Sequence, residues 1–120
     1  MAVSTQRIAV IGLGSMGYGM ARSLRRAGFA VRGCDVCADS VTRFVGEGGE
    51  GAATPAEAAR DADVVVSVVV NAAQTEAVLF GDNGACVAMT KGAVFVSAAT
   101  MDPEIARRLA ARVEAAGRLY

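Results

Sequence analysis

The stretch Arg7–Gly17, which reads RIAVIGLGSMG, decides the fold. A short apolar run typical of a buried strand leads directly into a G-x-G-x-x-G pattern, Gly12-Leu13-Gly14-Ser15-Met16-Gly17. In such a strand–turn–helix, the first glycine permits a tight turn and the second lets a pyrophosphate approach the backbone. The third lets the helix pack closely on the strand. The free N–H groups at the helix start would then face the phosphates, so the stretch predicts a dinucleotide site.

Asp35 supplies the second part of this pattern. It lies 21 positions after Gly14, at the end of the next predicted strand, Phe29–Cys34. An acid at that place accepts hydrogen bonds from the adenosine ribose hydroxyls, and a 2′-phosphate would meet its like charge. We therefore expect NAD, and not NADP, as the cofactor. A plain glycine turn and a solvated loop acid stay open as the simpler interpretations.

The rest of the chain alternates between strand and helix patterns. This alternation predicts an α/β fold, a Rossmann-type doubly wound parallel sheet with strand order 3-2-1-4-5. The predicted strands are Arg7–Ile11, Phe29–Cys34, Gly51–Ala53, Asp63–Val69 and Ala93–Ser97, and the predicted helices are Ser15–Ala27, one around Val41–Val45, Thr54–Arg60, Ala72–Phe80 and one from Asp102 to Gly117.

Length and charge narrow the classes of protein. A chain of 120 residues is expected to form one domain, 1–120. Lys+Arg and Asp+Glu are both 12, without a basic stripe, so we expect neither nucleic acid nor a membrane surface as a partner. No apolar run approaches the roughly 18 residues of a transmembrane helix. Met1–Arg7 does not resemble a signal peptide, and a cytoplasmic protein is expected.

The three cysteines include a C-x-x-C at Cys34–Cys37. Histidine is absent from the sequence and there is no second C-x-x-C, so we expect no metal site. A redox dithiol is the alternative to the simpler interpretation, in which Cys34 is a core residue at a strand end and Cys37 lies in the following loop.

The residues Ile11–Gly17, Met20-Ala21 and Leu24 together resemble the opening of the β-hydroxyacid dehydrogenases, the family of 3-hydroxyisobutyrate dehydrogenase. The resemblance continues in order along the chain, through Asp35 and on to Thr100. Within the family, Val70–Phe80 is most similar to the L-threonate dehydrogenase branch. The resemblance implies hydride transfer between a small hydroxy acid and NAD.

The resemblance also implies roles for single residues. The glycine loop, Gly12, Leu13, Gly14, Ser15, Met16 and Gly17, would bind the pyrophosphate and Asp35 the adenosine ribose. Val69, Val70 and Gln74 would border the cofactor, and Thr100 would lie at its nicotinamide end. The sequence departs from the family at two places: it has Val68-Val69-Val70 where Met-Leu-Pro is common, and Ser97-Ala98-Ala99-Thr100 where Asp-x-Ser-Thr is common.

Family members are more than twice as long as this chain, which we expect to stop before the sixth strand of the sheet and before a helical second domain. Their catalytic lysine lies in that second part. The single lysine here, Lys91, belongs to a turn, so we assign no catalytic residue and expect the chain alone to be inactive. A homo-oligomer is expected, with Ala93–Ser97 as an unpaired edge strand that joins a second copy or aggregates.

Two other functions stay open at this point. One is a stand-alone NAD-binding module without catalysis. The other is an imine reductase, a class that shares this opening but generally prefers NADP, against which Asp35 argues. Folds that bind FAD or S-adenosylmethionine also use glycine loops and a ribose acid, but the resemblance along the chain disfavours them.

Overall fold

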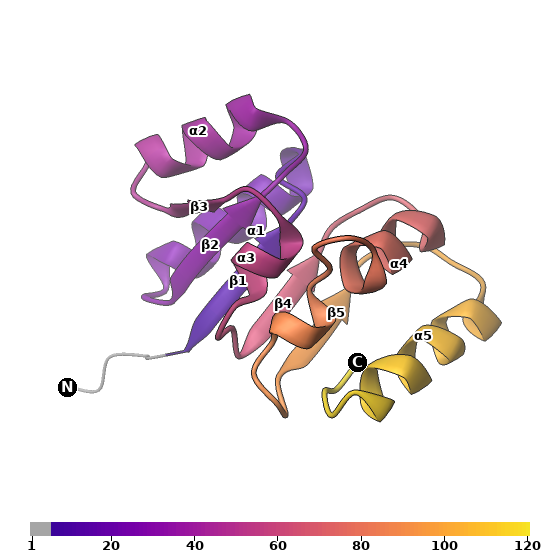
Figure 1. Cartoon of the computed structure of the whole chain (residues 1–120). Helices are drawn as coiled ribbons and strands as arrows, with labels where there is room; N and C mark the ends of the chain where they lie inside the picture. The colour runs from indigo at the N-terminus through magenta and orange to yellow at the C-terminus, as the bar shows by residue number, and fades with distance from the viewer. Residues whose placement is uncertain (1–5) are drawn as a thin grey trace.

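A computed structural model describes residues 6–120 and contains one five-stranded sheet (Figure 1). All neighbouring strands are parallel and their order is β3-β2-β1-β4-β5, so the predicted fold class and strand order are confirmed. The prediction that Met1–Arg7 is not a signal peptide concerns residues 1–5, which lie outside the described part. The elements are β1 (Arg7–Ile11), α1 (Ser15–Arg26), β2 (Ala30–Cys34), α2 (Ala38–Gly46), β3 (Glu50–Ala52), α3 (Pro55–Ala59), β4 (Val64–Ser67), α4 (Ala72–Phe80), the 3-10 turn η1 (Cys86–Ala88), β5 (Val94–Ser97) and α5 (Pro103–Ala115).

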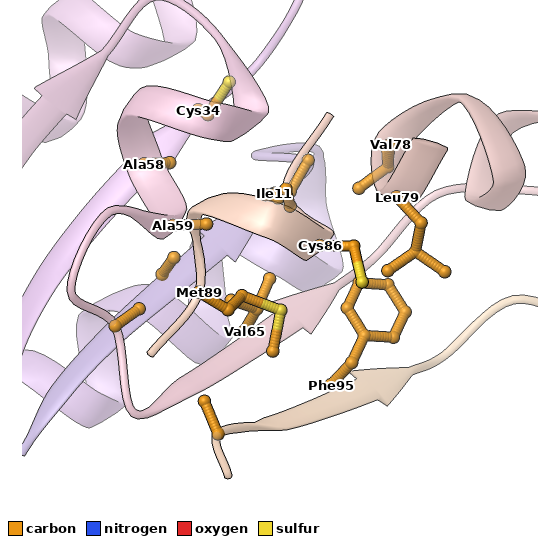
Figure 2. Close-up of a cluster of buried hydrophobic side chains, with 14 of the residues drawn as sticks. Ile11, Cys34, Ala58, Ala59, Val65, Val78, Leu79, Cys86, Met89 and Phe95 are labelled. Atoms are coloured by element: carbon orange, nitrogen blue, oxygen red, sulfur yellow. The ribbon is translucent and has the colours of Figure 1, made fainter. Parts of the chain in front are cut away.

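Helices cover both faces of the sheet, as expected for a doubly wound fold. On one face, α1 and α2 bury a cluster centred on Val10 and Phe44. On the other face, α3, α4, η1 and α5 bury a larger cluster around Val65 and Phe95, part of which Figure 2 shows. The strands of a sheet buried on both faces can be apolar at every position, which explains the β-branched run that forms β4.

Three of the predicted helices begin with a side-chain cap. Thr54, Asn71 and Asp102 occupy the N-cap positions of α3, α4 and α5, and each accepts a hydrogen bond from a backbone N–H of the first turn. Such caps satisfy donors that have no partner inside the helix. At the other end, Gly28 and Gly117 adopt positive φ values of 100° and 85°, as residues that end helices commonly do.

The prediction of an unpaired edge strand at Ala93–Ser97 is wrong for the first half of that strand. Leu119 lies beside β5 in a parallel bridge, where its carbonyl accepts from Phe95 N–H and its N–H donates to the carbonyl of Ala93. Arg118 holds this segment in place, because its buried guanidinium donates hydrogen bonds to the carbonyls of Val87, Met89 and Ala116. A pairing that covers the edge therefore comes from the chain itself.

Some local predictions differ from the structure at element ends. The turn η1 was not predicted, and it brings Cys86 into the larger core cluster beside Phe95 and Leu79 (Figure 2). The second predicted helix begins with Cys37 as its N-cap, so this cysteine is part of a helix start rather than of a loop alone. Cys34 is buried, as predicted.

Within residues 6–120, the structure has no helix whose length and apolar character would let it cross a membrane. The same residues contain no cluster of three or more histidine, cysteine or acidic side chains that could hold a metal ion.

Candidate functional site: a cleft at the carboxyl ends of the strands

The strand register brings the carboxyl ends of the strands to one level. Ile11 at the end of β1 is paired with Cys34 of β2 and with Ser67 of β4, and Cys34 is paired with Ala52 of β3. The residues that follow these ends must therefore emerge side by side at one edge. Between β1 and β4 the chain connections diverge to opposite sides, which is where open α/β sheets bind ligands.

A cleft of about 500 Å³ lies at this edge. Its volume is within the range, roughly 300–1,000 Å³, of small-molecule sites in proteins. The first residues after four strand ends, Gly12, Asp35, Ala53 and Val68, all contribute to it. The full lining is Ile11, Gly12, Gly14, Cys34, Asp35, Val36, Ala53, Pro55, Val68, Val69, Val70, Gln74, Ala77 and Val78.

The glycines of the loop after β1 differ in what surrounds them. Gly12 has φ +101°, and a Cβ there would lie 2.3 Å from the carbonyl oxygen of Val68. A Cβ at Gly17 would lie 1.8 Å from the carbonyl oxygen of Gly12, so the helix and the loop touch through backbone atoms. At Gly14, which is exposed, a Cβ would meet nothing within 4 Å. The first and third glycines are thus required by the fold, and the second leaves open space at the cleft.

The start of α1 also faces this edge with free backbone donors. Gly14 occupies the N-cap and offers no side chain that could bond the N–H groups of the first turn. These groups carry the positive end of the helix dipole, and they suit an anion such as a phosphate. The open space at Gly14 and the uncapped helix start together fit the pyrophosphate of a dinucleotide.

Asp35 is held in place by two backbone donors. Its Oδ2 accepts from Leu13 N–H at 2.5 Å and its Oδ1 accepts from Cys37 N–H at 2.7 Å. A carboxylate oxygen has two lone pairs, so each oxygen keeps capacity for a further hydrogen bond. The half-buried carboxylate is thereby fixed at the cleft as an acceptor, which suits ribose hydroxyls.

The structure brings together six of the eleven predicted site residues. Gly12, Gly14, Asp35, Val69, Val70 and Gln74 all line the cleft. Leu13 reaches the site only through its backbone N–H, because its side chain is buried in the core under α1. Ser15 and Met16 are exposed in the first turn of α1, and Gly17 is buried against Gly12. Thr100 is exposed in the loop between β5 and α5 and does not line the cleft.

Seven apolar residues of the lining were not predicted: Ile11, Val36, Ala53, Pro55, Val68, Ala77 and Val78. Their signals in the sequence are positional: Val36 follows the ribose acid and Ala53 follows a strand end, while Pro55 begins α3. Ala77 and Val78 lie three and four positions after Gln74, so one face of α4 carries all three into the cleft. These walls are apolar and fit a flat aromatic ring.

The two cysteines of the C-x-x-C have opposite environments. Burial, with the nearby charges of Asp35 and Glu57, raises the pKa of the Cys34 thiol to about 11. Hydrogen bonding from the backbone and side chain of Ser40 lowers the pKa of Cys37, which is exposed at the start of α2. Both thiols are free. The environment of Cys34 makes a reactive dithiol the weaker interpretation of this motif.

The cleft can bind and orient a ligand, but its side chains do not supply a base or a nucleophile. Among its lining side chains, only Asp35 and Cys34 can ionise. Asp35 is engaged by two backbone N–H groups, and the high pKa of Cys34 keeps its thiol protonated near neutral pH. Lys91 is exposed in the turn before β5 and is not part of the lining.

Comparison with known proteins shows the family and the fold of the chain. Residues 7–120 match the family described as the NAD binding domain of 6-phosphogluconate dehydrogenase. An L-threonate dehydrogenase of Cupriavidus necator is 49% identical over 115 residues, which are 96% of this chain and 39% of that protein. The crystal structure of a 3-hydroxyisobutyrate dehydrogenase from Salmonella typhimurium superimposes with a TM-score of 0.89 at 35% identity, covering 94% of this chain and 39% of that one.

An imine reductase from Streptomyces aurantiacus is also similar, with a TM-score of 0.82 and 32% identity over 95% of this chain and 39% of that chain. Enzymes that catalyse different reactions therefore share this fold. The chain spans about two-fifths of the length of these relatives.

Proposed function

Because the chain belongs to the family of the NAD-binding domain of 6-phosphogluconate dehydrogenase, we propose that it is the cofactor-binding part of an NAD-dependent hydroxyacid dehydrogenase. The observation that carries this proposal is the position of Asp35. Two backbone N–H groups fix its carboxylate at the cleft, beside the open space at Gly14. This arrangement fits an adenosine ribose next to a pyrophosphate.

In the proposed protein, NAD would supply the hydride acceptor for the oxidation of a small hydroxy acid, of the 3-hydroxyisobutyrate or L-threonate kind. The residues of this chain bind and orient. The uncapped start of α1 would hold the pyrophosphate, Asp35 would accept from the ribose hydroxyls, and the apolar walls would exclude water from the base. The proton of the substrate hydroxyl is taken by a group outside this cleft, because the cleft offers no suitable base.

NAD is proposed over NADP for an electrostatic reason. A 2′-phosphate would lie against the fixed carboxylate of Asp35, and the next residue, the fully exposed Val36, carries no charge that could offset it. Since imine reductases generally prefer NADP, the same carboxylate favours the hydroxyacid dehydrogenase. The three free cysteines fit a reducing compartment, and we place the protein in the cytoplasm as a homo-oligomer.

The test is a calorimetric titration of the 120-residue chain with NAD⁺ and with NADP⁺. We expect NAD⁺ to bind and NADP⁺ to bind at least tenfold more weakly. A folded chain that binds neither nucleotide, or that prefers NADP⁺, would contradict the proposed role of the cleft.

A further inference from the structure

Three arginines gather at the end of α1, at a place that the cleft does not reach. Arg22, Arg25 and Arg26 line a separate hollow of about 290 Å³ together with Phe44 of α2 and the C-cap of that helix, Glu47. None of these residues lines the cleft at the carboxyl ends of the strands. This basic hollow therefore combines three positive charges with one negative charge.

Two of the guanidinium groups meet at consecutive residues after α2. Nε of Arg22 lies 3.5 Å from Oε1 of Glu47. The guanidinium of Arg25 lies against Gly48, where an added Cβ would be 3.0 Å from both Cζ and Nη1 of the arginine. Because Gly48 has no side chain, the turn leaves room for this group. Contacts between the ends of two helices thus bring both cations to one place.

Stabilising the negative end of the helix dipole is the simpler role for arginines at the end of α1. The backbone already satisfies carbonyls there, however. The carbonyls of residues 23–25 accept from the N–H groups of residues 27–29, and those of residues 43–45 accept from residues 47–49. Within residues 6–120, none of the three guanidinium groups donates to a carbonyl, and neither Arg25 nor Arg26 has a carboxylate within ion-pair distance. Most donors of the basic hollow are therefore free for a ligand.

The charge of the basic hollow selects the class of ligand. Three arginines against one glutamate leave an excess of two positive charges, and a phosphate group carries about −2 near neutral pH. The planar guanidinium can donate two parallel hydrogen bonds to phosphate oxygens. We propose that the basic hollow binds a phosphate group, either free phosphate or that of a small phosphorylated molecule, through Arg22, Arg25 and Arg26. This inference is independent of NAD binding, because the two sites share no residue.

The probe for this site is inorganic phosphate, titrated into the isotope-labelled 120-residue chain at low ionic strength while the backbone amide shifts are followed by NMR. We expect saturable shifts at residues 22–28 and 47–49. Shifts confined to residues 14–17 would place the phosphate at the glycine loop and overturn the proposal, as would the absence of saturable shifts. Glycerol 3-phosphate, titrated in the same way, distinguishes the sources. Tighter binding of this ester indicates a phosphorylated molecule, and equal or weaker binding indicates free phosphate.

Substitutions separate this site from a general attraction of phosphate to positive charge. Arg25→Met removes one guanidinium from the basic hollow, whereas Arg108→Met, the matched control, removes the same charge from an exposed position of α5. Circular dichroism checks that each variant is folded. We expect Arg25→Met to bind phosphate about tenfold more weakly than Arg108→Met, the effect of one charge-assisted hydrogen bond.

Glu47→Gln should have the opposite effect on phosphate affinity. It removes the carboxylate that competes for Arg22, so phosphate should bind about threefold more tightly, as expected for the loss of one exposed ion pair. Equal phosphate affinity of Arg25→Met and Arg108→Met would overturn the proposal, whatever the affinity of the chain for NAD⁺.

Discussion

The backbone N–H of Leu13 donates to the carboxylate of Asp35, across 22 positions of sequence, at 2.5 Å. This hydrogen bond ties the glycine loop after β1 to the end of β2. A second donor, Cys37 N–H, fixes the other carboxylate oxygen. The acid that is proposed to bind the ribose is therefore also a structural link of the loop that is proposed to bind the pyrophosphate.

Replacing Asp35 should affect stability and cofactor preference together. In Asp35→Ala the N–H groups of Leu13 and Cys37 lose their acceptor, and we expect a loss of roughly 1–2 kcal/mol in the free energy of unfolding. NAD⁺ affinity should fall at least tenfold and the gap to NADP⁺ should narrow, because the charge that opposes a 2′-phosphate is gone. Urea denaturation and calorimetry measure the two effects. Asp35→Asn, with one oxygen, should be intermediate, and unchanged stability in both variants would argue against the link.

The same substitution should have opposite consequences at two glycines of one loop. Gly17→Ala places a Cβ against the backbone carbonyl of Gly12, so it should destabilise the chain although alanine is the better helix former. Gly14→Ala meets no atom within 4 Å, and its φ of −67° suits any residue, so stability should change little. Its NAD⁺ affinity should nevertheless fall, because the methyl group fills the space of the pyrophosphate.

Thermal melting and NAD⁺ titration of both variants check this pair. A Gly14→Ala chain that binds NAD⁺ as well as the unmodified chain would show that the open space is not used by the cofactor. A stable Gly17→Ala chain would show that the close approach of loop and helix can relax.

Cys37 should be the thiol that reacts first with iodoacetamide. Its pKa is lowered by hydrogen bonding from Ser40, and it is exposed, so its reaction rate should rise through a midpoint below the ordinary thiol pKa. Cys34 and Cys86 are buried with raised pKa values and should react only after unfolding. Mass spectrometry of chains labelled at a series of pH values identifies the modified residue. Labelling of Cys34 in the folded chain at pH 7 would be inconsistent with its buried position.

The raised pKa of Cys34 also has a consequence for stability at high pH. A group whose folded pKa lies above its unfolded value stabilises the fold fully below the unfolded pKa, and this contribution is lost as pH rises through the folded value. For Cys34 that window runs from about 8.5, the usual thiol value, up to about 11. The difference in urea stability between the unmodified chain and Cys34→Ala should therefore shift against the unmodified chain across this window. A constant difference would contradict the burial of the thiol in its protonated form.

Arg118 should be required for the stability of the chain end. Its guanidinium donates to carbonyls of the segment around η1 and to Ala116, and it is 8% exposed. Arg118→Met keeps the length of the side chain but leaves these carbonyls without their donor, and we expect a loss of roughly 3 kcal/mol in the free energy of unfolding. Arg108→Met, on an exposed position of α5, is the control. Equal stability of the two variants would contradict the role of Arg118 in holding Leu119 against β5.

Much of the fold was set by patterns local in the sequence. The alternation of strand and helix signals and the glycine pattern each act within a few residues, so they could be predicted from the sequence. The parallel order of the sheet followed because crossover connections obey a fixed handedness. The place of Asp35 at the mouth of the cleft followed from the end of its strand.

Other features depend on contacts between distant segments, and only the tertiary structure decided them. No local pattern connects Asp35 with Leu13, folds the side chain of Gln74 back onto the N–H of Val70, or brings Arg118 to the carbonyl of Met89. Each of these depends on hydrogen-bond geometry across several elements. By itself the sequence determined which residues reach the carboxyl edge of the sheet, because strand ends and helix starts are local. Which atoms there remain free for a ligand was decided by the packing that satisfies all the others.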